Sequence, residues 1–116
     1  MTYSESLAQQ IRSILAHTLS PHIFEEEVEE KKMFGGLAFM VRGKMAVTVS
    51  SRGQDLVMVR IGKEMEKQVL PRKGARVTLM KGRLYHGYID LNTEGQRELS
   101  YWIDLALAYN QELTEQ

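Results

Sequence analysis

Two short apolar segments, residues 37–41 and 45–49, flank Arg42-Gly43-Lys44 and constrain the fold more than any other feature of this chain. Glycine adopts the positive φ angles that tight turns require, so Gly43 favours a β-hairpin here. Alternate side chains of a strand lie on one face, because the side-chain period of a strand is two. We therefore expect Leu37, Phe39 and Val41 to share one face of the first strand. Met45, Val47 and Val49 should likewise share one face of the second.

Three more segments have the composition of strands and extend this hairpin into a sheet. Residues 56–61 follow a predicted turn at 51–54, while residues 77–80 and 84–91 flank Lys81-Gly82-Arg83 as a second hairpin. No helix alternates with the strands in the manner of a βαβ unit. We therefore expect an antiparallel sheet of about five strands.

The N-terminal part of the chain has the apolar spacing of a helix. Apolar residues recur at helical intervals from Leu7, which predicts a helix over residues 3–19. Thr2 and Glu5 have the spacing of a capping box for its first turn. Ser20-Pro21 ends the prediction, because the residue before a proline avoids the α region.

Two more helices complete the predicted fold. Residues 63–70 form a short helix that Pro71 ends, and a final helix runs to about Glu112 from a cap formed by Thr93 and Gln96. The predicted class is α+β, with N- and C-terminal helices packed on the sheet and a short helix between strands. Residues 1–116 are expected to form a single domain.

Composition excludes several classes of protein. The chain contains no cysteine, which excludes disulfides, thiolate zinc sites, iron–sulfur clusters and cysteine nucleophiles. Hydrophobic residues make up 43% and charged residues 26%, so a folded globular domain is expected and disorder is not. The N-terminus lacks the basic and apolar regions of a signal peptide, and the apolar stretches are too short to cross a bilayer. We expect a cytoplasmic location.

The formal net charge of zero conceals an uneven layout. Residues 1–30 hold one basic and six acidic side chains, residues 31–86 thirteen and three, and residues 87–116 one and six. One interpretation is that acidic helices lie over a basic sheet. The other is an exposed patch for nucleic acid, an acidic partner or a phosphorylated ligand. Arg83 and Tyr85 alternate onto one strand face, a pairing that nucleic-acid binders use and that packed sheets also contain.

Motifs for catalysis or metal binding are absent from the sequence. There is no GxGxxG, GxSxG or HExxH, and His17, His22 and His86 are scattered. Five glutamates occupy the six positions 25–30, which predicts a solvated face or an edge strand. A divalent-metal site is the alternative, but a linear run does not show that its oxygens converge. We expect no catalytic residues, no metal and no cofactor.

The final helix carries two adjacent apolar stripes. The first contains Leu99, Trp102, Ile103, Ala106 and Leu113, and the second contains Tyr101, Leu105, Ala108 and Tyr109. One stripe is enough to dock a helix on a sheet. The second predicts either a deeply buried helix or a surface for a partner chain, including a homodimer.

Several short motifs together resemble a known family. They are Met33-Phe34-Gly35-Gly36, Gly43-Lys44-Met45, Val59-Arg60-Ile61, Gly82-Arg83, Gly87-Tyr88 and Tyr101-Trp102-Ile103. Over roughly residues 18–113 the chain resembles the N-terminal domain of the TfoX/Sxy competence-regulator family. It departs after Gly82-Arg83, where the family commonly has Pro-Met and this chain has Leu84-Tyr85.

The resemblance implies a compact α+β domain with an antiparallel sheet. Full-length members are cytoplasmic regulators of DNA-uptake genes, are thought to work with the cyclic-AMP receptor protein, and carry a second, helical domain. Because this sequence ends at Gln116, we expect a stand-alone version of the N-terminal domain. The family offers no catalytic residues to carry over.

These observations lead to a non-enzymatic interaction module linked to transcriptional regulation or competence. The expected partner or anion contacts are Arg60, Lys81, Arg83 and Tyr85, with Tyr101, Leu105 and Tyr109 as a dimer or partner surface on the last helix. A structural role is expected for Met33, Phe34, Gly35, Gly36, Gly43, Gly82, Gly87 and Trp102. The alternatives are a nucleic-acid-binding module using residues 67–83, and a ligand-binding domain that clamps a small anion between Arg60 and Arg83.

Overall fold

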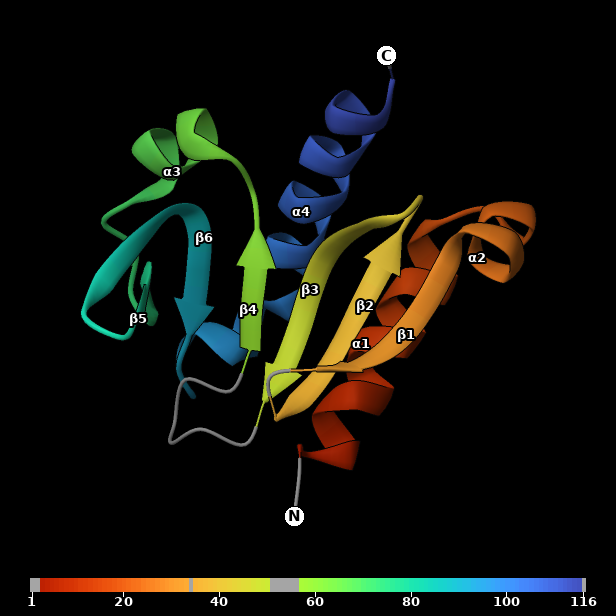
Figure 1. Ribbon diagram of the computed structural model, residues 1–116, viewed down its shortest axis with the longest axis horizontal. Helices are drawn as coiled ribbons and strands as arrows, with labels where there is room; N and C mark the ends of the chain where they lie inside the picture. The colour runs from red at the N-terminus through yellow and green to blue at the C-terminus, as the bar shows by residue number, and fades with distance from the viewer. Residues whose placement is uncertain (1–2, 34, 51–56, 116) are drawn as a thin grey trace.

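A single antiparallel sheet dominates the computed structural model of the chain, which describes residues 3–33, 35–50 and 57–115 (Figure 1). Its six strands within those residues are β1 Val28–Met33, β2 Gly36–Val41, β3 Lys44–Ser50, β4 Val57–Arg60, β5 Ala75–Met80 and β6 Arg83–Leu91. Their spatial order is β1-β2-β3-β4-β6-β5. The α+β class is confirmed, with one strand more than expected.

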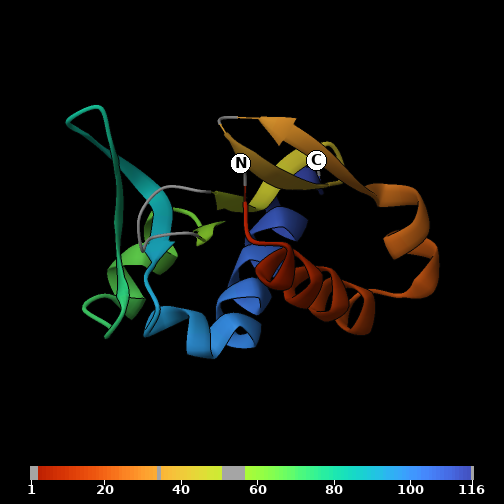
Figure 2. The ribbon, with the colours of Figure 1, turned by 90° about the horizontal axis from the view of Figure 1, so that it is seen from below.

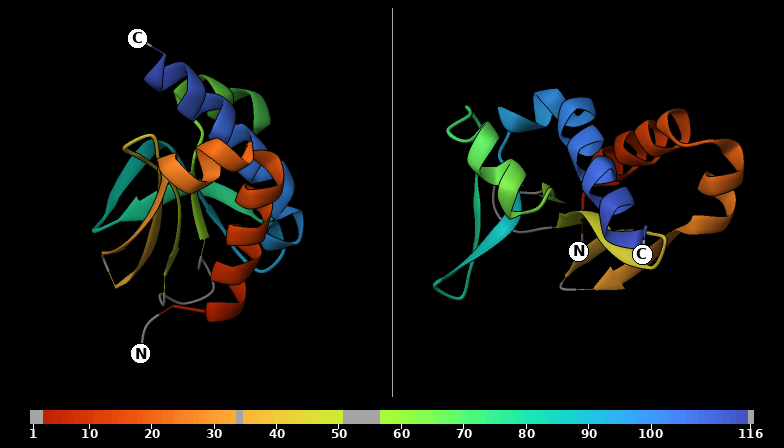
Figure 3. Two further views of the ribbon diagram at one scale, coloured as in Figure 1. Left: turned by 90° about the vertical axis from the view of Figure 1, so that its right-hand side faces the viewer. Right: turned by 90° about the horizontal axis from the view of Figure 1, so that it is seen from above.

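The helices lie to one side of this sheet. They are α1 Glu5–Thr18, α2 Pro21–Glu27, α3 Lys63–Val69 and α4 Leu99–Thr114, and a 3-10 turn at Gly95–Glu98 leads into α4. Figures 2 and 3 show α1 and α4 side by side against one face, while α3 packs against β6. No described helix covers the opposite face in these views.

The predicted central hairpin is confirmed as β2 and β3. Arg42 and Gly43 form its two-residue turn with φ angles of 53° and 79°. Met45 differs from the expectation that it shares a face with Val47 and Val49. The register shifts after Phe39, which pairs with Val47, and this irregularity places Ala46 in the core and leaves Met45 outside it. One extra residue in a strand reverses the direction of the side chains that follow.

The glutamate-rich segment is divided between two elements. Helix α1 ends at Thr18, before Ser20-Pro21 as expected, but the Ser20 side chain then accepts a hydrogen bond from Ile23 N and caps α2, with Pro21 in the first turn. The remaining glutamates lie in β1, at the edge of the sheet. Sequence reasoning missed α2, because proline was considered only as a helix terminator and not as a favourable first residue.

The predicted caps of the long helices need correction. Ser4, not Thr2, is the N-cap of α1 and accepts a hydrogen bond from Leu7 N. Asn92, not Thr93, caps the turn before α4, because its side chain accepts from the backbone N–H groups of Glu94 and Gly95. Thr2 lies outside the described residues, as do Phe34, the turn at 51–54 and Leu56.

The core lies between the sheet and helices α1 and α4. Trp102, Phe39, Ile11, Leu15 and Ile103 are among its largest fully buried side chains. In the first predicted stripe of α4, Leu113 is only half-buried, while Leu107 and Asn110 are buried. Asn110 donates to Val41 O and accepts from Arg42, so a buried polar side chain ties α4 to the turn of the central hairpin. Among the described residues no methionine belongs to this core.

Candidate functional site

The sheet face opposite α1 and α4, here called the open face, carries an apolar groove. Its volume is about 200 Å³. Methionine and tyrosine side chains dominate its lining, contributed by Met33, Met45, Met58, Met80, Tyr85 and Tyr88. Met58 pairs with Thr48 on β3 and with Asp90 on β6, so the groove crosses the middle of the sheet. Methionine is flexible and polarisable, which suits a surface that adapts to a partner.

The end of the β5–β6 hairpin, residues 78–85, projects from the sheet and is called the arm (Figure 2). Exposed large hydrophobic side chains of the described residues gather there: Leu79, Leu84 and Tyr85 are 44%, 58% and 37% exposed. At its base, Thr78 donates a 2.8 Å hydrogen bond to the buried carboxylate of Asp90. Lys81 and Arg83 stand at its tip and have no acidic partner among the described residues. The arm therefore joins apolar surface to unpaired positive charge.

A second hollow, the Arg60 cavity, lies between α3, β6 and the C-terminal half of α4. Its volume is about 500 Å³. The guanidinium carbon of Arg60 lies 5.4 Å from the ring centre of Tyr88 and 5.6 Å from that of Tyr109. No described residue forms an ion pair or hydrogen bond with this half-buried guanidinium. Lys63 and Leu105 also line the cavity.

Gly62 brings α4 close to the end of β4. Its φ angle is +89°, and a Cβ atom there would lie 2.6 Å from two ring atoms of Tyr109. Its N–H and that of Ile61 both donate to Gly87 O, which fixes the turn against β6. The absence of a side chain at residue 62 therefore lets the Tyr109 ring reach Arg60.

A charged contact beside the cavity fastens α3 to β6. Glu66 on α3 accepts a 2.6 Å hydrogen bond from Gly87 N and lies 2.8 Å from His86 Nδ1. Burial of the Glu66 carboxyl group raises its pKa, but the hydrogen bonds from Gly87 and His86 outweigh burial and leave the pKa below its ordinary value. Glu66 is therefore a carboxylate that fastens α3 to β6.

The basic segment 67–83 does not form one continuous surface. Lys67 pairs with Glu64 at 3.5 Å, and Arg72 pairs with Glu98 at 3.2 Å while lying 4.0 Å from the ring centre of Tyr101. Lys81 and Arg83 lie apart from these residues, on the arm. The charge layout is thus partly internal pairing and partly exposed.

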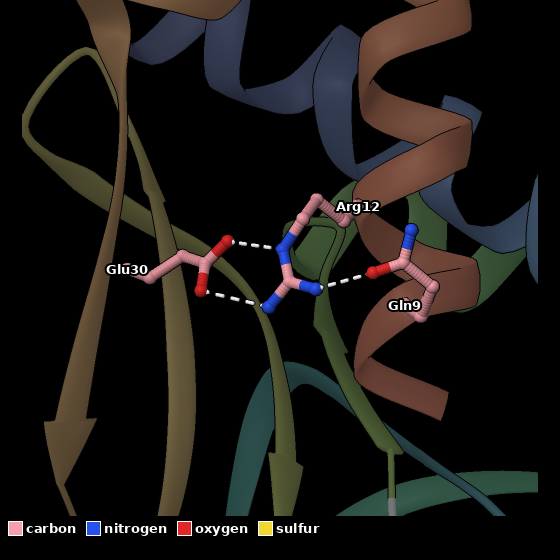
Figure 4. Close-up of polar contacts among 3 residues, drawn as sticks. All are labelled: Gln9, Arg12 and Glu30. Carbon is pink, nitrogen blue, oxygen red and sulfur yellow. Dashed lines mark hydrogen bonds and ion pairs between the residues drawn. The ribbon is translucent and has the colours of Figure 1, made fainter. Parts of the chain in front are cut away.

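The described ion pairs of the acidic N-terminal segment lie within that segment. Arg12 on α1 donates to both carboxylate oxygens of Glu30 on β1, at 2.6 and 2.9 Å, and to Gln9 at 2.6 Å (Figure 4). The hydrogen bond to Glu30 raises the pKa of the Arg12 guanidinium. The acidic run therefore leaves the positive charge of the arm uncovered.

The residues singled out from the sequence fall into separate places. Arg60, Leu105 and Tyr109 come together at the Arg60 cavity. Tyr85 lines the groove, and Tyr101 lies under Arg72. The two residues of the expected anion clamp are placed apart, since Arg60 lines the cavity beside Tyr88, while Arg83 begins β6 at the tip of the arm and is not among the cavity's lining residues.

Sequence reasoning missed most of the groove and half of the cavity. Met58 and Met80 were treated only as strand residues, although each alternates with residues of the opposite face, which is the signal that could have found them. Tyr88 and Lys63 carried no signal, because their convergence with Arg60 depends on how α3 packs. No cluster of three or more potential metal ligands occurs in the described part of the chain, and no helix in it is long and apolar enough to span a membrane.

Comparison with known proteins gives one match. Neither the curated proteins nor the solved structures contain a match to the chain. The family described as TfoX N-terminal domain matches residues 19–109, most of the sequence and all of the described sheet. The chain therefore belongs to the TfoX N-terminal domain family.

Proposed function

We propose that this domain is a non-enzymatic regulatory module that binds a protein partner through the groove and the arm. The partner segment presents apolar side chains and negative charge, and the setting is transcriptional regulation, as in competence. One observation carries the proposal: a methionine- and tyrosine-lined groove lies on a sheet face that no described helix covers, beside an arm with exposed apolar residues.

Charge complementarity defines the chemistry of the partner. Lys81 and Arg83 have no described acidic partner, and Asp90, the partner of Met58 in the sheet register, is 3% exposed and bonded to Thr78. An acidic segment would therefore meet positive charge at the arm without facing an exposed carboxylate there. Its apolar side chains would enter the groove, as an amphipathic helix enters the groove of its receptor.

Site-specific photo-crosslinking in the native cell tests where the partner binds. A photoreactive phenylalanine analogue replaces Met58 in the groove, and in the control it replaces Gln10, an exposed residue of α1. We expect a protein adduct from position 58 and none from position 10. Equal capture at both positions, or capture that nuclease treatment abolishes, would contradict the proposal.

Binding to the captured protein is then measured with purified components. Arg83→Glu and Tyr85→Ala each remove one element of the arm, and Arg97→Glu is the matched charge reversal on the 3-10 turn. We expect at least a tenfold loss for each arm variant, about 1.4 kcal/mol, and little change for the control. Equal losses in all three would show that general electrostatics, not the arm, drives binding.

Nucleic acid and a second copy of the chain are the competing partners. The dispersal of residues 67–83 argues against a nucleic-acid surface. Fluorescence titration with DNA and RNA at two salt concentrations decides this, since phosphate contacts weaken steeply with salt. Light scattering over a dilution series tests whether the chain forms a homodimer. Tight, salt-dependent binding of nucleic acid, or a dimer whose crosslink arises from position 58, would replace the proposed partner.

A further inference from the structure

The Arg60 cavity has properties that binding of a protein to the open face does not use. Its main lining elements are α3, β6 and α4, and its volume of about 500 Å³ lies in the range of small-molecule sites. Arg60 is half-buried within it, without an acceptor among the described residues for its N–H donors. Such a guanidinium is suited to a planar, bidentate anion.

We propose that this cavity binds a small organic monocarboxylate with a flat apolar body. The carboxylate pairs with Arg60. The two tyrosine rings that contact Arg60 help to hold the guanidinium in place, which lowers the conformational entropy lost on binding. Leu105 and the Tyr109 ring provide the apolar wall.

The charges around the cavity favour one negative charge over several. Arg60 and Lys63 are its lysine and arginine residues, while Glu64 and Glu112 also line it. Glu64 is paired with Lys67, so a phosphate monoester or a dicarboxylate would bring a second negative charge near Glu112, with only Lys63, whose charge also acts on Glu66, to balance it. A monocarboxylate is matched by Arg60 alone.

Gly62 and Glu66 preserve the shape of the cavity. Gly62 admits the Tyr109 ring, and Glu66 fixes α3 to β6 through Gly87 N. The cavity is therefore built from contacts that exist without a ligand. The cavity and the groove share Tyr88, but Arg60, Gly62 and Tyr109 line only the cavity, and the proposal does not depend on the protein partner.

The test compares 4-hydroxybenzoate with 4-hydroxybenzamide, which have the same shape but differ in charge. Amide chemical shifts of the isotope-labelled protein are followed during titration. We expect 4-hydroxybenzoate to bind with a dissociation constant of about 1 mM or tighter, a modest efficiency for about ten heavy atoms. The largest shifts should fall at Arg60, Gly62 and Tyr109, and the amide should bind at least tenfold more weakly.

Two variants with different mechanisms make the result decisive. Arg60→Gln removes the charge, with Arg97→Gln as the matched control outside the cavity. Ala108→Trp fills the cavity from an exposed position of α4 and leaves Arg60 in place. Both cavity variants should lose at least tenfold in affinity, while the control binds as the unaltered protein does.

Several outcomes would overturn the proposal. They are no saturable binding of 4-hydroxybenzoate, equal binding of the amide, unchanged affinity in Arg60→Gln or Ala108→Trp, or shifts confined to the arm. Inorganic phosphate serves as a competing probe, and tighter binding of phosphate than of 4-hydroxybenzoate would overturn the assignment to a monocarboxylate.

Discussion

The two faces of the sheet are built from different side chains. The face under α1 and α4 is made of branched aliphatic residues with Phe39 and Ala46, all nearly inaccessible to solvent and in one core with Trp102 and Ile103. The open face presents Met58, Thr48 and Tyr88 instead. Branched and aromatic residues have defined rotamers and pack closely, whereas methionine adapts to its surroundings. The difference separates the surface that holds the fold from the surface available for binding.

The strongest test of this comparison is a pair of truncations on opposite faces. Phe39→Ala should lower the free energy of unfolding by about 3–5 kcal/mol, because it leaves a large cavity in the core. Met58→Ala should lower it by about 1 kcal/mol, since Met58 is only half-buried. Urea denaturation monitored by circular dichroism measures both. Similar losses would mean that the open face also supports the fold, and the comparison would fail.

The elements of the sheet were predictable because local patterns specify them. Alternating apolar residues around Gly43 predicted β2 and β3, and the position of Pro71 marked the end of the short helix. The bulge after Phe39 was not predictable, because it adds one residue without changing the composition of the strand. Met45 was misplaced for this reason. Helix α2 was missed because Ser20-Pro21 both ends one helix and begins the next.

The candidate sites were less predictable than the fold, since they depend on contacts between distant elements. Arg60 and Tyr109 were each singled out from the sequence, but nothing in it indicated that they meet. That contact requires Gly62, whose missing side chain leaves room for the ring. Arg60 and Arg83 were expected to clamp an anion together, but Arg83 lies on the arm and does not line the Arg60 cavity. Charge and residue type identified the candidate residues in the sequence, but tertiary packing determines which other residues they contact.

The contact between Glu66 on α3 and β6 should make the free energy of unfolding depend on pH. The folded-state pKa of Glu66 lies below its ordinary value, so ionised Glu66 stabilises the fold above the pKa that it has in the unfolded chain. This contribution is lost as the pH falls through the lowered folded-state pKa, that is, below the ordinary glutamate value of about 4.3. Glu66→Gln should flatten the decline of unfolding free energy between neutral and acidic pH.

Urea denaturation at a series of pH values measures this effect, with Glu25→Gln on α2 as the control. Glu25 is exposed, and its substitution should leave the pH profile close to that of the unaltered protein. Parallel profiles for the unaltered protein and Glu66→Gln would show that the contacts with Gly87 and His86 do not favour the carboxylate form. The α3–β6 link would then be maintained by backbone packing alone.

The smallest expected effect on stability comes from the ion pair that joins α1 to the edge strand β1. Arg12 joins α1 to edge strand β1 through both oxygens of Glu30 and lies 6.0 Å from the ring centre of Phe39. The Arg12 and Glu30 side chains are each about one-third exposed. The coupling free energy between them should therefore be only about 0.5–1 kcal/mol in spite of the bidentate geometry. A double-mutant cycle with Arg12→Gln and Glu30→Gln isolates it from the loss of packing on Phe39.

The ionic origin of this coupling can be checked directly. The coupling free energy between Arg12 and Glu30 should decrease at about 1 M salt, where the Debye screening length is about 3 Å. The arm has no described ion pair at its tip, so the same salt should leave the stability contributed by Arg83 nearly unchanged when it is measured with Arg83→Gln. A zero coupling for Arg12 and Glu30 would make the two edges of the sheet equivalent. The helix-covered face would then be closed by apolar packing alone, and unpaired charge would no longer distinguish the arm.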